Sequence, residues 1–349
     1  MKHVGSCFAY FNRGGTTMRL TMCLKKMTAT SLLALASLVA ANAADFPVKA
    51  VSPIPDLPFF QVNDNRLSYS YIFNGTDPGV TGNTAKQAYS FTHFDTWAYG
   101  TNFFNLSMFK SDHADPANGC KGPNEGCAGA TEIYGVLRST FGFNQIFDTH
   151  MFTVGPLQNV SLELGTDFNT ENNPFAPNKR ALFAGLQFAF DLPYKGYINF
   201  APMFYKELNH NSFVEGPALP TGAIDYDPTW AFESNYYMDL GFLPDYLPLS
   251  VSGRLTLIGP KGPQADPIPA SPSNVQTKME INSEPIRLTY DASRAIWGKK
   301  YSHFLDVWVA YRYWQNKFGL DHANSPSCLG AAAGSCTEES LYTGVTVKF

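Results

Sequence analysis

Hydrophobic and polar residues alternate with a period of two in twelve segments along the chain. In one of them Leu182, Leu186 and Phe188 fall on one face, and Gln187 and Asp191 fall on the other. A period of two predicts β-strands, and segments of about ten residues are typical of membrane β-barrels. The twelve segments are 66–74, 88–98, 101–111, 131–141, 157–168, 180–191, 196–207, 228–240, 247–258, 276–290, 303–316 and 339–349.

The last segment, Leu341 to Phe349, reads LYTGVTVKF and alternates without interruption. An open apolar strand of this kind would be an aggregation hazard in a soluble protein. We therefore expect this strand to pair with the first one, which closes the sheet and removes its edges. An aromatic last residue on an alternating strand also resembles the assembly signal of bacterial outer-membrane proteins, so we expect Phe349 to contact their assembly machinery.

The connections between the segments alternate between long and short. Residues 112–130 and 259–275 are long connections, whereas Tyr99-Gly100 and 193–195 are tight turns. A soluble β-sandwich has no reason to alternate in this way, but an outer-membrane barrel joins its strands by short periplasmic turns and long extracellular loops. The fold class predicted for residues 66–349 is all-β, a transmembrane antiparallel β-barrel of twelve strands.

Composition agrees with this prediction. Charged residues make up only 15% of the chain and aromatic residues another 15%, with 28 Gly and 24 Pro to supply turns. Residues 1–43 resemble a cleaved secretory leader that ends in Ala41-Asn42-Ala43, with Met18 and Met22 as alternative translation starts. Residues 44–65 are expected to form a periplasmic N-terminal segment. The leader holds five of the 25 basic residues and no acidic one, so the mature chain has a net charge of −9, which argues against nucleic acid as a partner.

Four cysteines remain after the leader, in two close pairs, Cys120 with Cys127 and Cys328 with Cys336. An exported chain folds in an oxidising compartment, where such pairs form disulfides. Zinc is the alternative, but there is no Cys-x-x-Cys and no paired His nearby, and disulfides are favoured. The sequence implies neither a metal nor an organic cofactor.

Several short stretches carry a resemblance to a known family. They are FTHFDTWAYGTNFFNLSMF at residues 91–109, SLELGTDFN at 161–169 and TEESLYTGVTVKF at 337–349. The Tyr99-Gly100 turn and the aromatic strand after it resemble the nucleoside-specific channel-forming, Tsx-like family of outer-membrane proteins, which includes OmpK-type proteins. The resemblance implies passive diffusion of nucleosides or similar small solutes through a narrow lumen. This chain has Asn105 where an Asp is expected, which changes the charge of that lumen position.

Strand parity predicts which side chains face the lumen, where aromatic faces and polar groups would bind a solute. The predicted solute-binding residues are Asn105, Tyr134, Arg138, Glu163, Asp167, Tyr205, Glu233, Arg254, Asp306, Trp308, Arg312 and Trp314. The alternative for each charged residue is that it pairs across the lumen and plugs it. In segment 88–98, His93 and Asp95 share a face with Trp97, and the sequence leaves open whether that face points to the lumen or to lipid.

Three functional classes remain. The preferred one is a diffusion channel in the outer membrane of a Gram-negative cell, in contact with lipid and lipopolysaccharide. The second is a closed or nearly closed barrel that acts as a surface receptor, adhesin or structural protein through its long loops. An enzyme is not expected, because no G-x-S-x-G, H-E-x-x-H or phosphate-binding glycine loop is present, although a spatial Ser/His site on the outer wall is not readable from one sequence.

Overall fold

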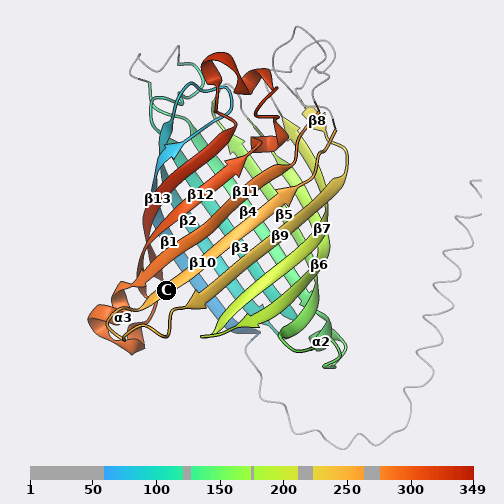
Figure 1. Cartoon of the computed structure of the whole chain (residues 1–349), viewed down its shortest axis with the longest axis vertical. Coiled ribbons are helices and arrows are strands. Elements are labelled where there is room, and N and C mark those ends of the chain that lie inside the picture. Colours follow the sequence, from blue (N-terminus) through green and yellow to red (C-terminus); the bar gives the residue numbers. More distant parts are fainter. Residues whose placement is uncertain (1–58, 121–126, 174–176, 211–222, 263–275) are drawn as a thin grey trace, which may run out of the picture. The chain divides into compact units, whose positions relative to one another are not determined.

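A computed structural model describes residues 59–120, 127–173, 177–210, 223–262 and 276–349 (Figure 1). Antiparallel pairing joins twelve strands into a ring in chain order, and the last strand pairs with the first. The ring consists of β1 (Phe60–Gly75), β2 (Thr84–Trp97), β3 (Gly100–Ser111), β4 (Thr131–Gly142), β5 (Leu157–Glu171), β6 (Arg180–Leu192), β7 (Gly196–His210), β9 (Thr229–Asp239), β10 (Leu249–Ile258), β11 (Glu280–Asp291), β12 (Leu305–Gln315) and β13 (Thr337–Lys348). A short strand, β8 (Ala223–Asp225), extends the pairing at the end of β7.

The ring is closed by β1 and β13, whose register runs from Arg66 opposite Lys348 to Ile72 opposite Tyr342. Each of the twelve ring strands therefore has a neighbour on both sides, and the predicted twelve-stranded closed barrel is confirmed. β1 begins at Phe60, six residues before the predicted start, so residues 60–65 of the predicted N-terminal segment belong to the barrel wall. The predicted leader, 1–43, lies outside the described residues.

Alternate connections gather at opposite ends of the barrel, as predicted, but their lengths overlap, because residues 143–156 and 292–304 at one end are longer than residues 76–83 at the other. At the short-connection end are Ala98-Tyr99, residues 193–195, and the connections that hold helices α2 (Phe143–Ile146) and α3 (Ala292–Trp297). The long connections all lie at the opposite, long-connection end (Figure 1). No helix in the described part of the chain is long and apolar enough to cross a membrane.

The tight turn before Gly100 depends on the absence of a side chain. A Cβ on Gly100 would lie 1.8 Å from the carbonyl oxygen of Thr140 on the neighbouring strand, which is far inside van der Waals contact. Only glycine allows β3 to begin directly beside β4, so this glycine is needed for the close approach of two backbones.

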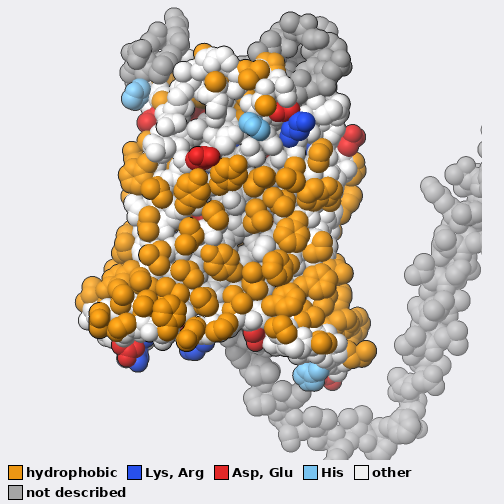
Figure 2. Space-filling view, in the orientation of Figure 1, with side chains coloured by type: hydrophobic (Ala, Val, Ile, Leu, Met, Phe, Trp, Pro, Cys, Tyr) orange, Lys and Arg blue, Asp and Glu red, His pale blue; other side chains and the backbone are white. Residues whose placement is uncertain are grey.

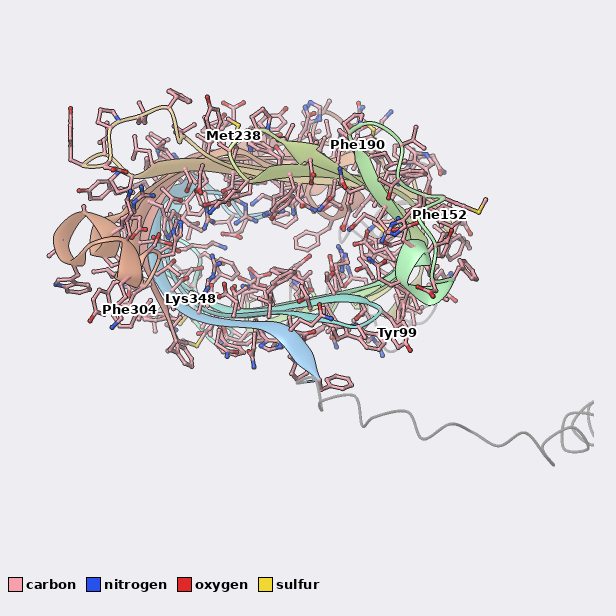
Figure 3. The ribbon with its side chains drawn as sticks, turned by 90° about the horizontal axis from the view of Figure 1, so that it is seen from below. Tyr99, Phe152, Phe190, Met238, Phe304 and Lys348 are labelled. Atoms are coloured by element: carbon pink, nitrogen blue, oxygen red, sulfur yellow. A yellow bond between two sulfur atoms is a disulfide. The ribbon has the colours of Figure 1, made fainter. Side chains whose placement is uncertain are left out.

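The barrel is apolar outside and polar inside, the reverse of a soluble protein. Leu182 is 62% exposed on the outer wall, whereas Asp167 and Glu163 on the neighbouring strand are buried inside. Figure 2 shows one outer face, where hydrophobic side chains form a continuous band and charged groups lie only above and below it. Viewed from the short-connection end, the wall is an oval ring with side chains pointing inward and outward (Figure 3).

Candidate functional site

The structure places all twelve predicted solute-binding residues on the inner wall. Their side chains form hydrogen bonds or ion pairs with one another or with other inward groups: Asn105 with Thr92, Tyr134 and Arg138 with Asp167, Glu163 with Gln187, Tyr205 with Glu207, Glu233 with Arg138, Arg254 with Asn282, Asp306 with His303, Trp308 with Thr346, Arg312 with Glu338 as an ion pair only, and Trp314 with Glu280. Inward parity was thus read correctly from the alternation, while solute binding by these residues stays a prediction.

Arg138 is the centre of one group in the lumen. Its Nε and Nη2 donate to the two carboxylate oxygens of Glu233 at 2.9 and 2.6 Å, and its Nη1 donates to Asp167 at 2.8 Å. The guanidinium carbon lies 4.0 Å above the Phe183 ring, and Tyr134 donates a hydrogen bond to Asp167. Such two-pronged charge-assisted bonds fix the planar guanidinium in one orientation.

The outer half of the lumen, toward the long-connection end, is filled by buried ion pairs. Lys261 pairs with Glu207, and Lys317 pairs with Glu338, and in both pairs the side chains are at most 3% exposed. Arg312 lies 3.5 Å from Glu338 and is 15% exposed. We call these five residues the outer layer. These pairs cover most of their own charged groups, and a cavity lined in part by Arg312, Lys317 and Glu338 lies beside them.

Sequence reasoning identified Arg312 but missed both lysines of the outer layer. Lys261 follows β10, and Lys317 lies in a short 3₁₀ turn after β12, so neither belongs to an alternating strand segment. Alternation predicts the direction of a strand side chain but says nothing of a side chain in a connection. The only signal that could have pointed to these lysines is general: a lysine is rarely buried unless it has a charged partner.

The inner half of the lumen, toward the short-connection end, is accessible to water. Arg66 and Lys348 are 43% and 39% exposed, Arg287 is 30% exposed, and Arg254 is exposed. Their carboxylate partners are covered, since Asp64 and Glu284 are each 7% exposed. The accessible charged groups among these are therefore cationic.

Aromatic side chains line the same region. The rings of Tyr197 and Tyr237 stack at 6.2 Å with an interplanar angle of 25°, and Tyr197 is 44% exposed. Arg287 lies 4.0 Å above the Trp308 ring. We call Arg66, Tyr197, Tyr237, Arg254, Arg287 and Lys348 together the vestibule. It combines flat aromatic faces with hydrogen-bond donors, which are the two features that recognise a ring-bearing polar solute.

The outer wall carries a polar chain near the short-connection end. His93 Nδ1 is 2.8 Å from Asn65 and Nε2 is 3.0 Å from Asp95, Asn102 donates to Asp95 at 2.9 Å, and Ser139 donates to Asn102 at 2.7 Å. These residues share the face of the exposed Tyr89 and Leu137, so the open question about segment 88–98 is answered: His93 and Asp95 face outward. The serine hydroxyl bonds to an asparagine and not to the histidine, so these contacts form no Ser–His pair for nucleophilic catalysis.

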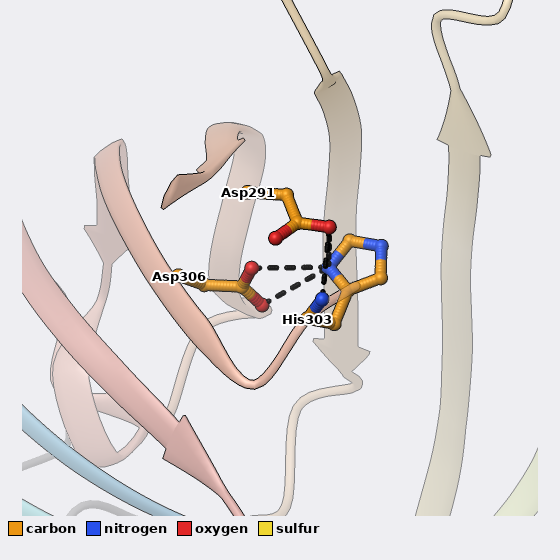
Figure 4. A group of neighbouring side chains, drawn as sticks. All are labelled: Asp291, His303 and Asp306. Carbon is orange, nitrogen blue, oxygen red and sulfur yellow. Dashed lines mark hydrogen bonds and ion pairs between the residues drawn. The ribbon is translucent and has the colours of Figure 1, made fainter. Parts of the chain in front are cut away.

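Two groups of carboxylates have the spacing of a metal site. In the first, His303 Nδ1 lies 3.0 Å from Asp306 and 3.9 Å from Asp291 (Figure 4). The hydrogen bond to Asp306 raises the pKa of His303 above its ordinary value. Asp291 accepts from two hydroxyls, of Ser293 and Ser302, and from two backbone N–H groups, of Arg294 and His303. A carboxylate with four donors is saturated, so this group serves as the cap of α3.

The second group, Asp77, Asp115 and Glu171, lies at the long-connection end. Asp115 is fully buried, and burial together with the neighbouring Asp77 raises the pKa of Asp115 to about 6. Lys86 donates to Asp77 at 2.5 Å. A cavity lined by Asp77, Lys86, Glu171, Asn173 and other groups opens beside these carboxylates.

A closed antiparallel ring with an apolar exterior and a polar interior defines the class: this chain is a transmembrane β-barrel. No protein-family model matches the sequence, and no curated protein matches it. Among solved structures, the translocator domain of the autotransporter NalP from Neisseria meningitidis is similar at 10% identity and a TM-score of 0.37, over 93% of this chain and 96% of that one. The β domain of the Bordetella autotransporter BrkA is similar at 6% identity and a TM-score of 0.34, over 82% and 99%. OccK11 (OpdR) of Pseudomonas aeruginosa is similar at 9% identity and a TM-score of 0.27, over 82% and 95%.

Proposed function

We propose that this protein is an outer-membrane channel for the passive diffusion of nucleosides or similar small polar solutes. The observation that carries the proposal is the water-accessible vestibule, in which inward arginines stay 30–43% exposed inside a closed barrel. Charged groups that only filled a plugged lumen would be covered throughout, as they are in the outer layer. An exposed, fixed cationic surface next to aromatic rings supports solute entry from the short-connection side.

A nucleoside has a flat base and a hydroxylated sugar, and the vestibule offers a partner for each. The stacked Tyr197 and Tyr237 present ring faces to a base, while Arg66 and Arg254 present N–H donors to sugar oxygens. Several weak contacts of this kind suit a channel, because a solute must leave as readily as it enters. The resemblance to the Tsx-like family supports the same substrate class.

Asn105 is the position at which this chain departs from the Tsx-like pattern. Its amide donates to Thr92 at 2.8 Å, and it accepts from Ser107 at 2.9 Å, so the position is held by neutral hydrogen bonds on the wall. A carboxylate there would add negative charge to the lumen. We therefore infer that this barrel is more tolerant of anionic solutes than one with Asp at this position.

The proposal includes the surroundings of the barrel. The apolar band would contact lipid and lipopolysaccharide, the long connections would face the cell exterior, and the leader would be cleaved near Ala43. Phe349 is 65% exposed, and its N–H donates to the Asn65 carbonyl, so the ring is accessible to assembly factors. We propose no catalytic role for the chain.

Conductance of the refolded mature barrel in a planar bilayer tests the proposal. Adenosine and thymidine are added in turn, with a sugar and an amino acid of similar size as comparison solutes. Saturable current block by the nucleosides alone is expected, and Tyr237→Leu should weaken it severalfold. The control Tyr246→Leu changes a tyrosine that is 77% exposed in a connection and should leave the block unchanged. A folded barrel without conductance contradicts the proposal.

A second function is favoured by the outer layer. Its buried ion pairs close off part of the lumen, which fits a surface receptor, adhesin or structural protein that acts through its long connections. Under this alternative the folded barrel conducts no current, and shortening the described loop residues 321–335 abolishes binding of a surface partner.

A further inference from the structure

We propose that the long-connection end binds a calcium ion through Asp77, Asp115 and Glu171. One oxygen from each of the three carboxylates lies within 4.8 Å of the others. Two oxygens on opposite sides of a calcium ion are separated by about 4.8 Å at most, since each Ca²⁺–O distance is about 2.4 Å. The three ligand atoms are thus already close enough to share one ion.

Two carboxylate oxygens in this group have no hydrogen-bond partner. Asp77 Oδ2 and Glu171 Oε1 are buried and accept no hydrogen bond from any described residue, although both residues are more than nine-tenths covered. A buried carboxylate oxygen without a donor carries a desolvation cost that nothing offsets. A cation between these atoms would supply the missing interaction.

The charges around the group point the same way. Glu132 and Glu171 are directly opposite each other on β4 and β5, an arrangement that like charges destabilise. Among the described residues, Lys86 forms an ion pair with Asp77 at 2.5 Å, while the nearby Lys317 and Arg312 pair with Glu338 instead. The carboxylates here, Glu338 included, still outnumber these three cations, and a divalent ion would reduce that negative excess.

The chemistry of the ligands selects the kind of ion. All three are carboxylates, and the Asn173 amide nitrogen donates to Asp115 at 3.4 Å. Hard oxygen ligands without a thiol or imidazole favour Ca²⁺ or Mg²⁺ over zinc or copper. Three acidic groups from one strand and two loops form the flexible arrangement that calcium accepts, whereas Mg²⁺ demands near-octahedral geometry.

The three ligands come from different parts of the barrel end, which suggests a structural role for the ion. Asp77 lies in the connection after β1, Asp115 in the connection after β3, and Glu171 at the end of β5. A shared ion would tie two connections to the barrel wall and line the cavity that opens there. The site is separate from the vestibule, so it does not depend on the proposed transport function.

Calorimetric titration of the refolded barrel in detergent, freed of metal with a chelator, tests the site with CaCl₂ and with MgCl₂. One calcium ion per chain is expected, with a Kd of about 10⁻⁴–10⁻³ M, as for extracellular calcium modules. Glu171→Gln and Asp115→Asn should each weaken binding at least about tenfold. Asp245→Asn is the matched control, because that carboxylate is 73% exposed at the opposite end. No binding, equal binding in all variants, or tighter binding of magnesium overturns the proposal.

Thermal unfolding provides a second, independent measurement of the same site. In chelator, Glu171→Gln should unfold at the same or a higher temperature than the natural chain, because it removes a repulsion with Glu132. In 10 mM calcium the order should reverse. An order that is the same in both conditions contradicts a calcium site at Glu171.

Discussion

Arg138 and Glu233 form a two-pronged ion pair inside the barrel, although three strands separate β4 from β9 around the ring. The pair joins parts of the wall that share no backbone hydrogen bonds. Arg138 also holds Asp167 on β5, so one guanidinium balances two carboxylates.

Replacing Arg138 by methionine should destabilise the barrel strongly. Methionine fills much of the same space but leaves Asp167 and Glu233 covered without their ion-pair partner, and breaking a buried pair in this way costs about 3–5 kcal/mol. Arg254→Met is the control, since Arg254 is exposed in the lumen and its side chain makes one hydrogen bond, at 3.3 Å to Asn282. Urea unfolding from detergent measures both. Equal losses in the two variants would mean that the pair across the lumen contributes nothing.

Trp308 limits the size of the residue at position 344. A Cβ on Gly344 would lie 2.4 Å from Trp308 Cζ2 and 2.7 Å from the Tyr69 carbonyl oxygen. Gly344→Ala should therefore destabilise the barrel by about 1–3 kcal/mol, as overpacking does. Combining it with Trp308→Leu should recover part of the loss, which a double-mutant cycle by unfolding detects. Additive effects would show that the ring does not cause the clash.

The contact between His303 and Asp306 should make stability depend on pH. The pKa of His303 is raised above 6.5, with Asp306, Asp291 and Asp239 as the nearby acids, and Tyr237 faces its other ring nitrogen. A group whose folded pKa is raised stabilises fully below its unfolded pKa and loses this contribution as pH rises through the folded value. Melting temperature should therefore fall as pH rises above the ordinary histidine pKa of about 6.5.

His303→Asn should flatten that pH dependence. Asparagine tolerates the left-handed backbone at this position, where φ is 60°, so the substitution tests the charge without straining the chain. His150→Asn, an exposed histidine at the same end of the barrel, should leave the profile unchanged. A profile that keeps its slope in His303→Asn assigns the dependence to other groups.

Removing one disulfide should affect a connection rather than the whole barrel. Cys328 and Cys336 are bonded and almost fully buried, and they pack with Trp314, Phe318 and Leu320. Replacing both by alanine removes the constraint on a short loop in the unfolded chain. The free energy of unfolding should fall by about 2–3 kcal/mol. Limited proteolysis should cut residues 321–335 faster while the ring strands stay protected. The pair Cys120–Cys127 serves as a comparison, because its residues are more exposed. Unchanged cleavage would argue against a stabilising clip.

Much of the fold was predictable because a barrel wall is a local pattern. Each strand shows its inner and outer face through alternation, and the same alternation in Asp306, Trp308 and Arg312 gave their inward direction. The long and short connections assigned the two ends. Twelve strand segments and both disulfides follow from these signals.

The sequence could not reveal contacts that depend on the curvature of the ring. Nothing local brings Lys261 to Glu207, 54 residues away, or Asp115 to Glu171. The direction of β2 was also ambiguous, because its outward face carries both the apolar Phe91 and the polar Asp95. On that face Asn65 of β1 bonds to His93, and Asn102 of β3 bonds to Asp95. Partners on neighbouring strands cannot be read from the sequence of one strand.

Pairing of β1 with β13 has a consequence for the order of assembly. Lys348 bonds to Asp64 across 284 residues of sequence, so these two strands can meet only after every other strand has been synthesised. Loop closure over such a length is slow compared with the formation of hairpins between consecutive strands. Any sheet that forms before that meeting has two unpaired edge strands, so a chaperone or the membrane would have to protect it from aggregation during this interval.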